Sequence, residues 1–319
     1  MKQLVLFFLF TSLNIFSQEF IKVDSKVLEY PRFSTVELLA SQIENDFSTD
    51  KDKARAAFFW LAKNIRYNLK EYYNPRQRSY RFSYATEAEK IAKYQNLVDN
   101  LVKTTFRSKT GVCEEYAQSF KKICDLLHIE AEVIKGNVRN AAAEIGEIPN
   151  TTNHAWNAVK IDDEWLILDA TWAAGYEYNG KWIRDFNDYF YDIPKDKILK
   201  SHYPEASIWM LRFGRMTVDE FYNQPIYSNT FLGLEAELIA PKRGTIELEN
   251  KDFIELKFKN LADSLLLFYV FKGSNKATKP EISIEGKITT LKIPNPKRNT
   301  DLVLYINKVD ALHFKVKMI

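Results

Sequence analysis

Three residues of this chain have the types and local settings from which a nucleophilic enzyme site is built. Cys113 follows Gly111, and His154 and Asp169 come later in that order, each inside a strongly patterned segment. A cysteine attacks a carbonyl carbon as its thiolate, an imidazole takes the thiol proton, and a carboxylate holds that imidazole in one tautomer. We interpret the three residues as a nucleophile, its base and the group that orients the base.

The helix predicted from about Val112 to Leu127 places Cys113 in its first turn. The backbone N–H groups and the dipole at a helix start stabilise a thiolate, and the same N–H groups could hold an oxyanion. Cys124 lies eleven residues further along, which is about 16 Å of helical rise. Bridged cysteines need Cα atoms within about 7 Å. The two cysteines therefore cannot pair within this helix, and we expect Cys124 to be a core residue.

A hairpin is predicted for residues 154–172, with β-rich strands His154–Ile161 and Glu164–Trp172 joined by a two-residue turn. In that register, Asp169 is the diagonal neighbour of His154 on the same face of the sheet. Their side chains are then within reach of a hydrogen bond. This geometry supports the interpretation of Cys113, His154 and Asp169 as catalytic residues.

Two tryptophans flank these residues and have two interpretations. Trp156 and Trp172 either belong to the core or line the cleft, and we name them as candidate substrate-binding residues.

The remaining histidines are scattered without the spacing of metal ligands: His128, His202 and His313. The chain has no CxxC pair, no HExxH motif and no glycine-rich phosphate loop. We therefore expect no metal and no nucleotide or other cofactor.

The composition is that of a folded protein with more than one domain. The chain has 319 residues, of which 46% are hydrophobic and 27% charged, and its formal net charge is +3. This length suffices for two domains with a sizeable core in each. Because the charge is near neutral and no basic run is dense, we expect no nucleic-acid partner. Oligomeric state cannot be predicted from these features.

Residues 1–17 have the order of a secretory signal peptide. Lys2 precedes the apolar run Leu4–Phe10, which is too short to span a bilayer comfortably, and Ser17 is a small residue suited to the cleavage site. An uncleaved membrane anchor is the alternative. No later segment is long and apolar enough to cross a membrane, so we expect a mature chain that is exported to the periplasm or the extracellular space.

Residues 18–226 and 227–319 are predicted to form two domains of different character. In the first, residues 17–30 are expected to be irregular, helices are expected to begin near Thr35 and Thr49, and Arg139–Thr152 is expected to form one wall of a cleft. The second domain contains seven or eight short β-rich runs at turn-like intervals, which is typical of an antiparallel, Ig-like β-sandwich.

At these residues the chain resembles the transglutaminase-like superfamily, of the kyphoscoliosis-peptidase type. The resemblance covers about 50–225, more than half the chain, and is carried by Gly111-Val112-Cys113, Tyr116-Ala117, His154-Ala155-Trp156-Asn157, Asp169-Ala170-Thr171-Trp172, Asp52-Lys53-Ala54-Arg55-Ala56, Trp60, Asn64-Ile65-Arg66-Tyr67, His202-Tyr203-Pro204 and Trp209. It implies a papain-like α+β core with Cys113, His154 and Asp169 as its triad. It does not extend to the C-terminal sandwich.

The chain departs from the pattern of that family at two places. Glu115 adds a charge beside the nucleophile, where a small residue often stands. No glutamine or tryptophan shortly before Cys113 supplies a second oxyanion donor, because Arg107 and Lys109 occupy that region.

These features favour an exported cysteine-dependent enzyme that transfers acyl groups from protein or peptide amides. Water as the acceptor would make it a peptidase, which we favour because water needs no acceptor subsite. An amine acceptor would make it a crosslinking transglutaminase. The alternative from another class is a catalytically inactive binding or scaffold protein, with the sandwich as its partner-binding part. Glu115 and the missing second oxyanion donor are the two arguments for it.

Overall fold

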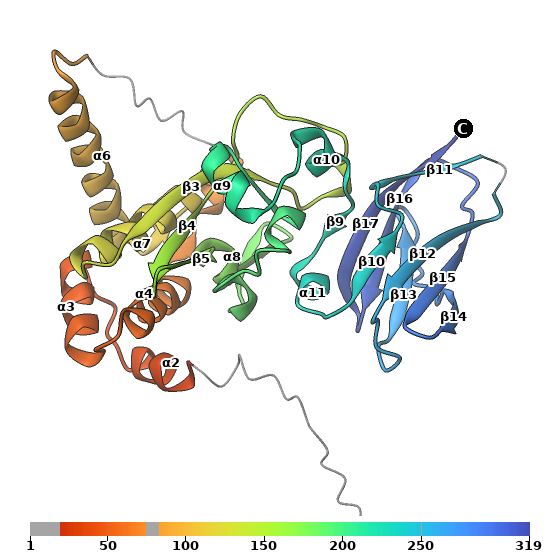
Figure 1. Ribbon diagram of the computed structural model, residues 1–319, viewed down its shortest axis with the longest axis horizontal. Helices are drawn as coiled ribbons and strands as arrows, with labels where there is room; N and C mark the ends of the chain where they lie inside the picture. The colour runs from red at the N-terminus through yellow and green to blue at the C-terminus, as the bar shows by residue number, and fades with distance from the viewer. Residues whose placement is uncertain (1–19, 75–82, 250) are drawn as a thin grey trace, which may run out of the picture. The chain divides into compact units, whose positions relative to one another are not determined.

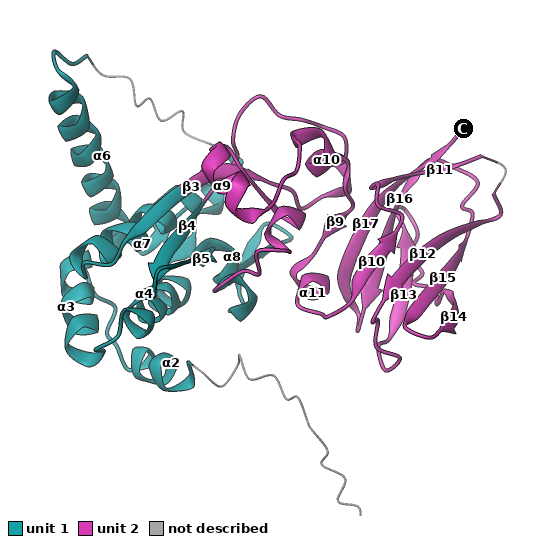
Figure 2. Ribbon diagram, viewed as in Figure 1, with its two compact units in different colours: residues 1–133, 156–191 teal, residues 134–155, 192–319 magenta. Residues whose placement is uncertain are grey.

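A computed structural model describes residues 20–74, 83–249 and 251–319 of the protein (Figure 1). The described residues divide into two compact units, one within 1–133 and 156–191 and the other within 134–155 and 192–319 (Figure 2). The predicted signal peptide, residues 1–17, lies outside the described residues, and the domain boundary at 226/227 stays a prediction. Among the described residues, no helix combines the length and the apolar character needed to span a membrane.

Helices dominate the first unit, and α7 packs against four of them: α3, α4, α6 and α8. The helices are α2 (Ile21–Leu28), α3 (Val36–Asp46), α4 (Asp50–Asn64), α5 (Leu69–Tyr73), α6 (Glu87–Ser108), α7 (Cys113–Leu126) and α8 (Ala170–Ala173). The apolar residues of α4 and α7 that face this packing are almost inaccessible to solvent, among them Phe58, Trp60 and Phe120. Burial of such side chains is the main source of their stability.

Threonine side chains begin three of these helices. Thr35, Thr49 and Thr86 each accept a hydrogen bond from the backbone N–H three residues later, at 3.3, 3.1 and 3.1 Å. Each bond satisfies one of the N–H groups that a helix start leaves without an intrahelical partner. The predicted helix starts at Thr35 and Thr49 are thereby confirmed.

Helix α2 corrects the expectation that residues 17–30 are irregular. Its buried Val23 and Val27 lie one turn apart, and Asp24 accepts two hydrogen bonds from the guanidinium of Arg55, at 2.8 and 2.6 Å. Arg55 is itself only 2% exposed. Because this contact joins residues thirty-one positions apart, the local sequence could not reveal it.

The sheet that carries the candidate site has the strand order β5-β4-β3-β8. Its strands are β3 (Ala131–Val138), β4 (His154–Ile161), β5 (Glu164–Leu168) and β8 (His202–Pro204). The predicted hairpin register is confirmed, with Ile161 opposite Glu164. The predicted second strand to Trp172 is wrong, because it ends at Leu168 and α8 follows.

Residues 173–236 form short elements that the sequence did not predict. They are β6 (Gly175–Tyr178), β7 (Lys181–Arg184), α9 (Ser207–Phe213), α10 (Val218–Asn223), β9 (Ile226–Tyr227) and α11 (Asn229–Leu232).

The C-terminal region forms two sheets, and the prediction of seven or eight strands is confirmed, with eight among the described residues. They are β10 (Glu237–Ala240), β11 (Thr245–Leu248), β12 (Phe253–Lys259), β13 (Leu267–Phe271), β14 (Glu281–Glu285), β15 (Ile288–Pro294), β16 (Thr300–Ile306) and β17 (Val309–Met318). One sheet has the order β10-β12-β15-β14 and the other β11-β17-β16-β13, with β9 also paired to β17. Exposed and buried residues alternate along β12, as expected for a strand with one face in a core. The pairings are antiparallel except that of β11 with β17, which is parallel.

Candidate active site

A short parallel pairing fixes the chain just before Cys113. Strand β1 (Arg66–Tyr67) pairs with β2 (Thr110–Gly111), so that Tyr67 lies opposite Gly111. The N–H of Asn68 donates to the carbonyl of Gly111 at 2.9 Å. The start of α7 is therefore anchored to the segment that follows α4.

Glu115 completes this anchor. Its carboxylate accepts a hydrogen bond from the N–H of Val112 at 3.0 Å, and the residue is 5% exposed. A Cβ atom on Gly111 would lie 2.4 Å from the Cβ of Glu115, a distance that real structures essentially never show. The departure from the family pattern at Glu115 thus has a structural explanation: this side chain fills the space beside Gly111 and holds the turn that precedes Cys113.

Cys113 is the first residue of α7, and its thiol is free and half-buried. Val112 at the helix cap has no side-chain acceptor, so the cap does not occupy the first-turn N–H groups. These groups and the helix dipole favour a negative charge at this position. Cys124 is completely buried, and burial raises the pKa of its thiol, so the expectation that it packs in the core is confirmed.

Asp169 is the cap of α8 as well as a candidate catalytic residue. Its Oδ1 accepts hydrogen bonds from the N–H groups of Thr171 and Trp172, at 2.9 and 3.0 Å, and the residue is 1% exposed. Its own N–H donates to the carbonyl of Phe190 at 2.9 Å. The two bonds to Oδ1 fix the carboxylate in one orientation.

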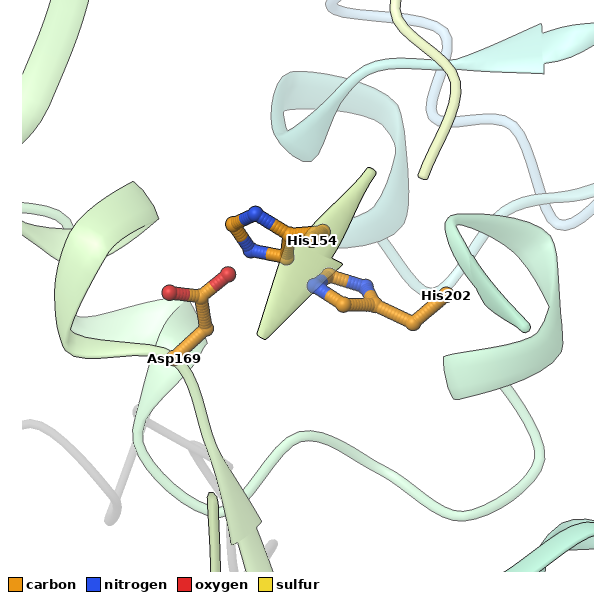
Figure 3. A group of neighbouring side chains, drawn as sticks. All are labelled: His154, Asp169 and His202. Carbon is orange, nitrogen blue, oxygen red and sulfur yellow. The ribbon is translucent and has the colours of Figure 1, made fainter. Parts of the chain in front are cut away.

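The structure brings His154 and Asp169 together and adds His202 to them. One ligand atom of each of the three side chains lies within 4.8 Å of the others, and all three residues are buried. Figure 3 shows the three side chains converging, with the carboxylate of Asp169 turned toward the ring of His154. The rings of His154 and His202 have centroids 5.7 Å apart. That Cys113, His154 and Asp169 act as one triad stays a prediction.

Asn157 fixes strand β4 relative to the helix of the cysteine. Its amide nitrogen donates to the carbonyl of Ala117 in α7 at 3.0 Å and to that of Glu132 in β3 at 3.1 Å. The residue is 1% exposed. Two hydrogen bonds of one buried amide therefore set the position of β4 against both neighbours.

Tyr67 is a site residue that sequence reasoning missed. Burial raises the pKa of its phenol well above the usual value, and electrostatic interactions with Cys113 and Asp169 add to this effect. The phenol therefore stays protonated, and its ring stacks on Trp182 with centroids 5.3 Å apart. The signal that could have found it is the run Asn64–Tyr67, which belongs to the resemblance but has no residue type that marks it as functional.

His202 is the second missed residue. The sequence showed it only as one of three scattered histidines without metal-ligand spacing, whereas the structure places it beside His154 and Asp169. Strand β8 pairs with β3 and places His202 opposite Val138. The run His202-Tyr203-Pro204 was part of the resemblance, but only the sheet order reveals its neighbours.

The two candidate substrate-binding tryptophans differ in exposure. Trp156 is 1% exposed, so its ring packs in the core, which is the first of its two interpretations. Trp172 is half-buried and meets Phe190 edge-on, with centroids 5.5 Å apart.

Neither basic residue ahead of Cys113 stands out as an oxyanion donor. Arg107 is exposed. The ammonium group of Lys109 donates to the carbonyls of Phe33 and Phe106 and lies 5.1 Å from the ring of Trp60, and burial lowers its pKa to about 8. The second donor is therefore still unassigned among the described residues.

Two imidazoles and one carboxylate are also a set of donors that Zn²⁺ accepts. The group His154, Asp169 and His202 therefore has to be tested for metal binding, although the sequence predicted none.

The protein carries a transglutaminase-like domain. Residues 38–170, which include all three predicted catalytic residues, match the model of the transglutaminase-like superfamily. This superfamily includes cysteine protease-like enzymes, and the fold with its mixed helices and strands and C-terminal antiparallel sheets agrees with it.

Among characterised proteins, the chain is similar to the human (Homo sapiens) protein kyphoscoliosis peptidase. The two are 22% identical over 223 residues, which are 69% of this chain but only 31% of the human protein. A solved transglutaminase structure covers 57% of this chain and 41% of its own at 18% identity, with a TM-score of 0.31. A candidate cysteine protease from Cytophaga hutchinsonii covers 46% of this chain and 42% of its own at 20% identity, with a TM-score of 0.26.

Proposed function

We propose that the protein is an exported cysteine-dependent enzyme that cleaves protein or peptide amides through Cys113, His154 and Asp169. The observation that carries the proposal is the buried pair of His154 and Asp169, in which backbone N–H groups hold the carboxylate. Cys113 at the start of α7 supplies the thiol.

In the first half of the reaction, the sulfur of Cys113 attacks the amide carbonyl carbon while His154 takes the thiol proton. The tetrahedral intermediate collapses, the C–N bond breaks, and His154 gives the proton to the departing amine, which leaves a thioester on Cys113. Asp169 stabilises the imidazolium of His154 during this step. The first-turn N–H groups of α7 are suited to hold the negative oxygen.

In the second half, an acceptor cleaves the thioester. Water gives a carboxylic acid and restores the thiol, with His154 taking a proton from water and returning it to sulfur. We favour water because it needs no acceptor subsite, and the name of the similar human protein agrees with peptidase activity. A primary amine as the acceptor would instead give a crosslinked product.

The test compares wild type with Cys113→Ser on a peptide library, with cleavage read by mass spectrometry. Cleavage that disappears in the variant, without incorporation of a fluorescent primary amine into a protein acceptor, supports hydrolysis. Incorporation of the amine by wild type alone supports transfer. If neither activity depends on Cys113, the proposal is wrong and a binding role takes its place.

We propose export on the order of charge and apolar residues at positions 1–17. Expression of the full chain in a bacterium followed by cell fractionation tests it. We expect a product outside the cytoplasm that begins at residue 18, and a full-length chain in the cytoplasm would contradict export.

A further inference from the structure

Val138 in strand β3 is a neighbour of the segments that carry both His154 and His202. Asn153, directly before His154, accepts a hydrogen bond from the N–H of Val138 at 2.9 Å and donates one to its carbonyl at 3.0 Å. On the other strand neighbouring β3, His202 is the register partner of Val138. Val138 is therefore a common reference for both histidines.

The ring of His202 is held on its far side. Its Nδ1 lies 2.8 Å from the hydroxyl oxygen of Ser201, and both residues are almost fully buried, at 0% and 1% exposure. Since Nδ1 is occupied by Ser201, Nε2 is the nitrogen that remains to face other groups. Figure 3 shows this ring turned toward His154 and Asp169.

A second buried imidazole beside the catalytic base restricts how that base can rotate. The ring planes of His154 and His202 meet at 57°, with centroids 5.7 Å apart. A general base must present one nitrogen to the nucleophile, and a small error in its orientation reduces the rate strongly. A buried ring that cannot turn is suited to prevent such an error.

We propose that His202, held by Ser201, is a positioning residue that keeps the imidazole of His154 oriented for proton transfer. This inference rests on the proposed function, because it gives His154 the role of the base. It predicts that His202 governs the reactivity of Cys113 and the state of the His154 ring without contributing to the binding of substrate.

Two substitutions separate this role from simple packing. His202→Asn keeps a polar atom where Nδ1 meets Ser201 and removes the group that faces His154, whereas His202→Gln keeps a polar atom near the position of Nε2. His313→Asn is the matched control, because His313 also has a side-chain hydrogen-bond partner next to it in its segment, the carboxylate of Asp310 at 3.2 Å. Thermal unfolding verifies that each variant is folded.

The two readouts are the rate of Cys113 alkylation by iodoacetamide and the tautomer of His154, from ¹⁵N-resolved NMR of its ring. We expect His202→Asn to slow alkylation by about tenfold and to change the population of the His154 tautomers, with partial rescue in His202→Gln. We expect His313→Asn to change neither. Wild-type alkylation and an unchanged tautomer in folded His202→Asn would overturn the proposal.

The two proposals fail in different ways. If His154→Ala leaves alkylation of Cys113 unchanged, the proposed function is wrong, whereas the NMR readout still tests whether His202 orients His154. A calorimetric titration with ZnCl₂ tests the alternative that His154, Asp169 and His202 bind a metal ion. Stoichiometric Zn²⁺ binding that is lost in His202→Asn and kept in His313→Asn would overturn the positioning role, because His202 would then be a metal ligand.

Discussion

Among single residues, Glu115 has a different role in the structure from the one that the sequence indicated. From the sequence it is a charge beside the nucleophile and an argument for an inactive protein. In the structure its carboxylate accepts the N–H of Val112 and the residue is 5% exposed. The side chain is therefore part of the device that sets the start of α7, which removes one of the two arguments against catalysis.

Glu115→Gln and Glu115→Ala separate the charge from the hydrogen bond. The amide oxygen of glutamine still accepts the N–H of Val112, so we expect Glu115→Gln to keep stability and Cys113 alkylation near wild type. Alanine loses the bond, and we expect a loss of about 1 kcal/mol in the free energy of unfolding, together with slower alkylation. Chemical denaturation and iodoacetamide kinetics measure both effects. Much faster alkylation in Glu115→Gln would instead show that the charge restrains the thiol.

Tyr67→Phe tests the phenol near Cys113. The pKa of Tyr67 is raised by burial and by electrostatic interactions with Cys113 and Asp169, so at neutral pH its hydroxyl is protonated and can donate a hydrogen bond. We expect its removal to slow Cys113 alkylation about threefold to tenfold, because a hydrogen-bond donor near the thiolate is lost. Tyr72→Phe, at the partner ring of Tyr67, is the control. Equal rates for both variants would show that the phenol does not act on the cysteine.

The residue types were enough to predict the candidate nucleophile, its base and the carboxylate. They were not enough to predict the residues that would hold or surround these groups. Cys113, His154 and Asp169 stand out because their types form a known catalytic set. Tyr67 and His202 were missed because only strand pairings between distant segments place them near the candidate site. Tyr67 pairs with Gly111, and His202 pairs with Val138.

At the scale of elements, the start of α7 depends on the absence of a side chain at Gly111. We expect Gly111→Ala to lower the free energy of unfolding by about 1–3 kcal/mol, because its Cβ would lie 2.4 Å from that of Glu115. Alkylation of Cys113 should slow as the turn shifts. Gly180→Ala is the control, since no atom lies within 4 Å of the added Cβ, although its left-handed backbone adds some strain of its own. A smaller loss in Gly111→Ala than in Gly180→Ala would contradict this explanation.

The hairpin shows what an element's sequence pattern can and cannot predict. Alternation and the Asp162-Asp163 turn gave the correct register, because the side-chain period of a strand leaves little freedom. The end of the second strand was misplaced because Asp169 bonds two later N–H groups and starts a helical turn. Helix α2 was missed for a related reason: its cap residue Phe20 makes no side-chain hydrogen bond, and the salt bridge from Asp24 to Arg55 is not local.

At the scale of the whole molecule, the eight strands of the C-terminal region were predictable from their alternation, whereas the parallel pairing of β11 with β17 was not. This parallel pairing joins the second of the eight strands to the last one, and nothing in the sequence of either strand specifies its partner. Within the second unit, strand β17 also contacts the segment before His154. The ammonium group of Lys315 in β17 donates a hydrogen bond to the carbonyl of Ile145 at 2.6 Å.

Lys315→Met tests whether this tie orders the segment 139–152. We expect faster hydrogen exchange in that segment and a loss of about 1 kcal/mol in the free energy of unfolding, because one hydrogen bond to a partly buried carbonyl is removed. Lys317→Met, an exposed position on the same strand, is the control. Unchanged exchange across 139–152 in Lys315→Met would show that the segment is held by other contacts.

In the proposed function, Cys113 is an activated nucleophile whose base is His154. The most direct test is the rate of iodoacetamide labelling at about pH 6, located by mass spectrometry, with the buried Cys124 as the internal reference. We expect Cys113 to react much faster than a free thiol and His154→Ala to abolish the excess rate, whereas His313→Ala should leave it unchanged. Labelling of Cys113 no faster than that of a free thiol, or labelling that is indifferent to His154, would contradict the proposed function.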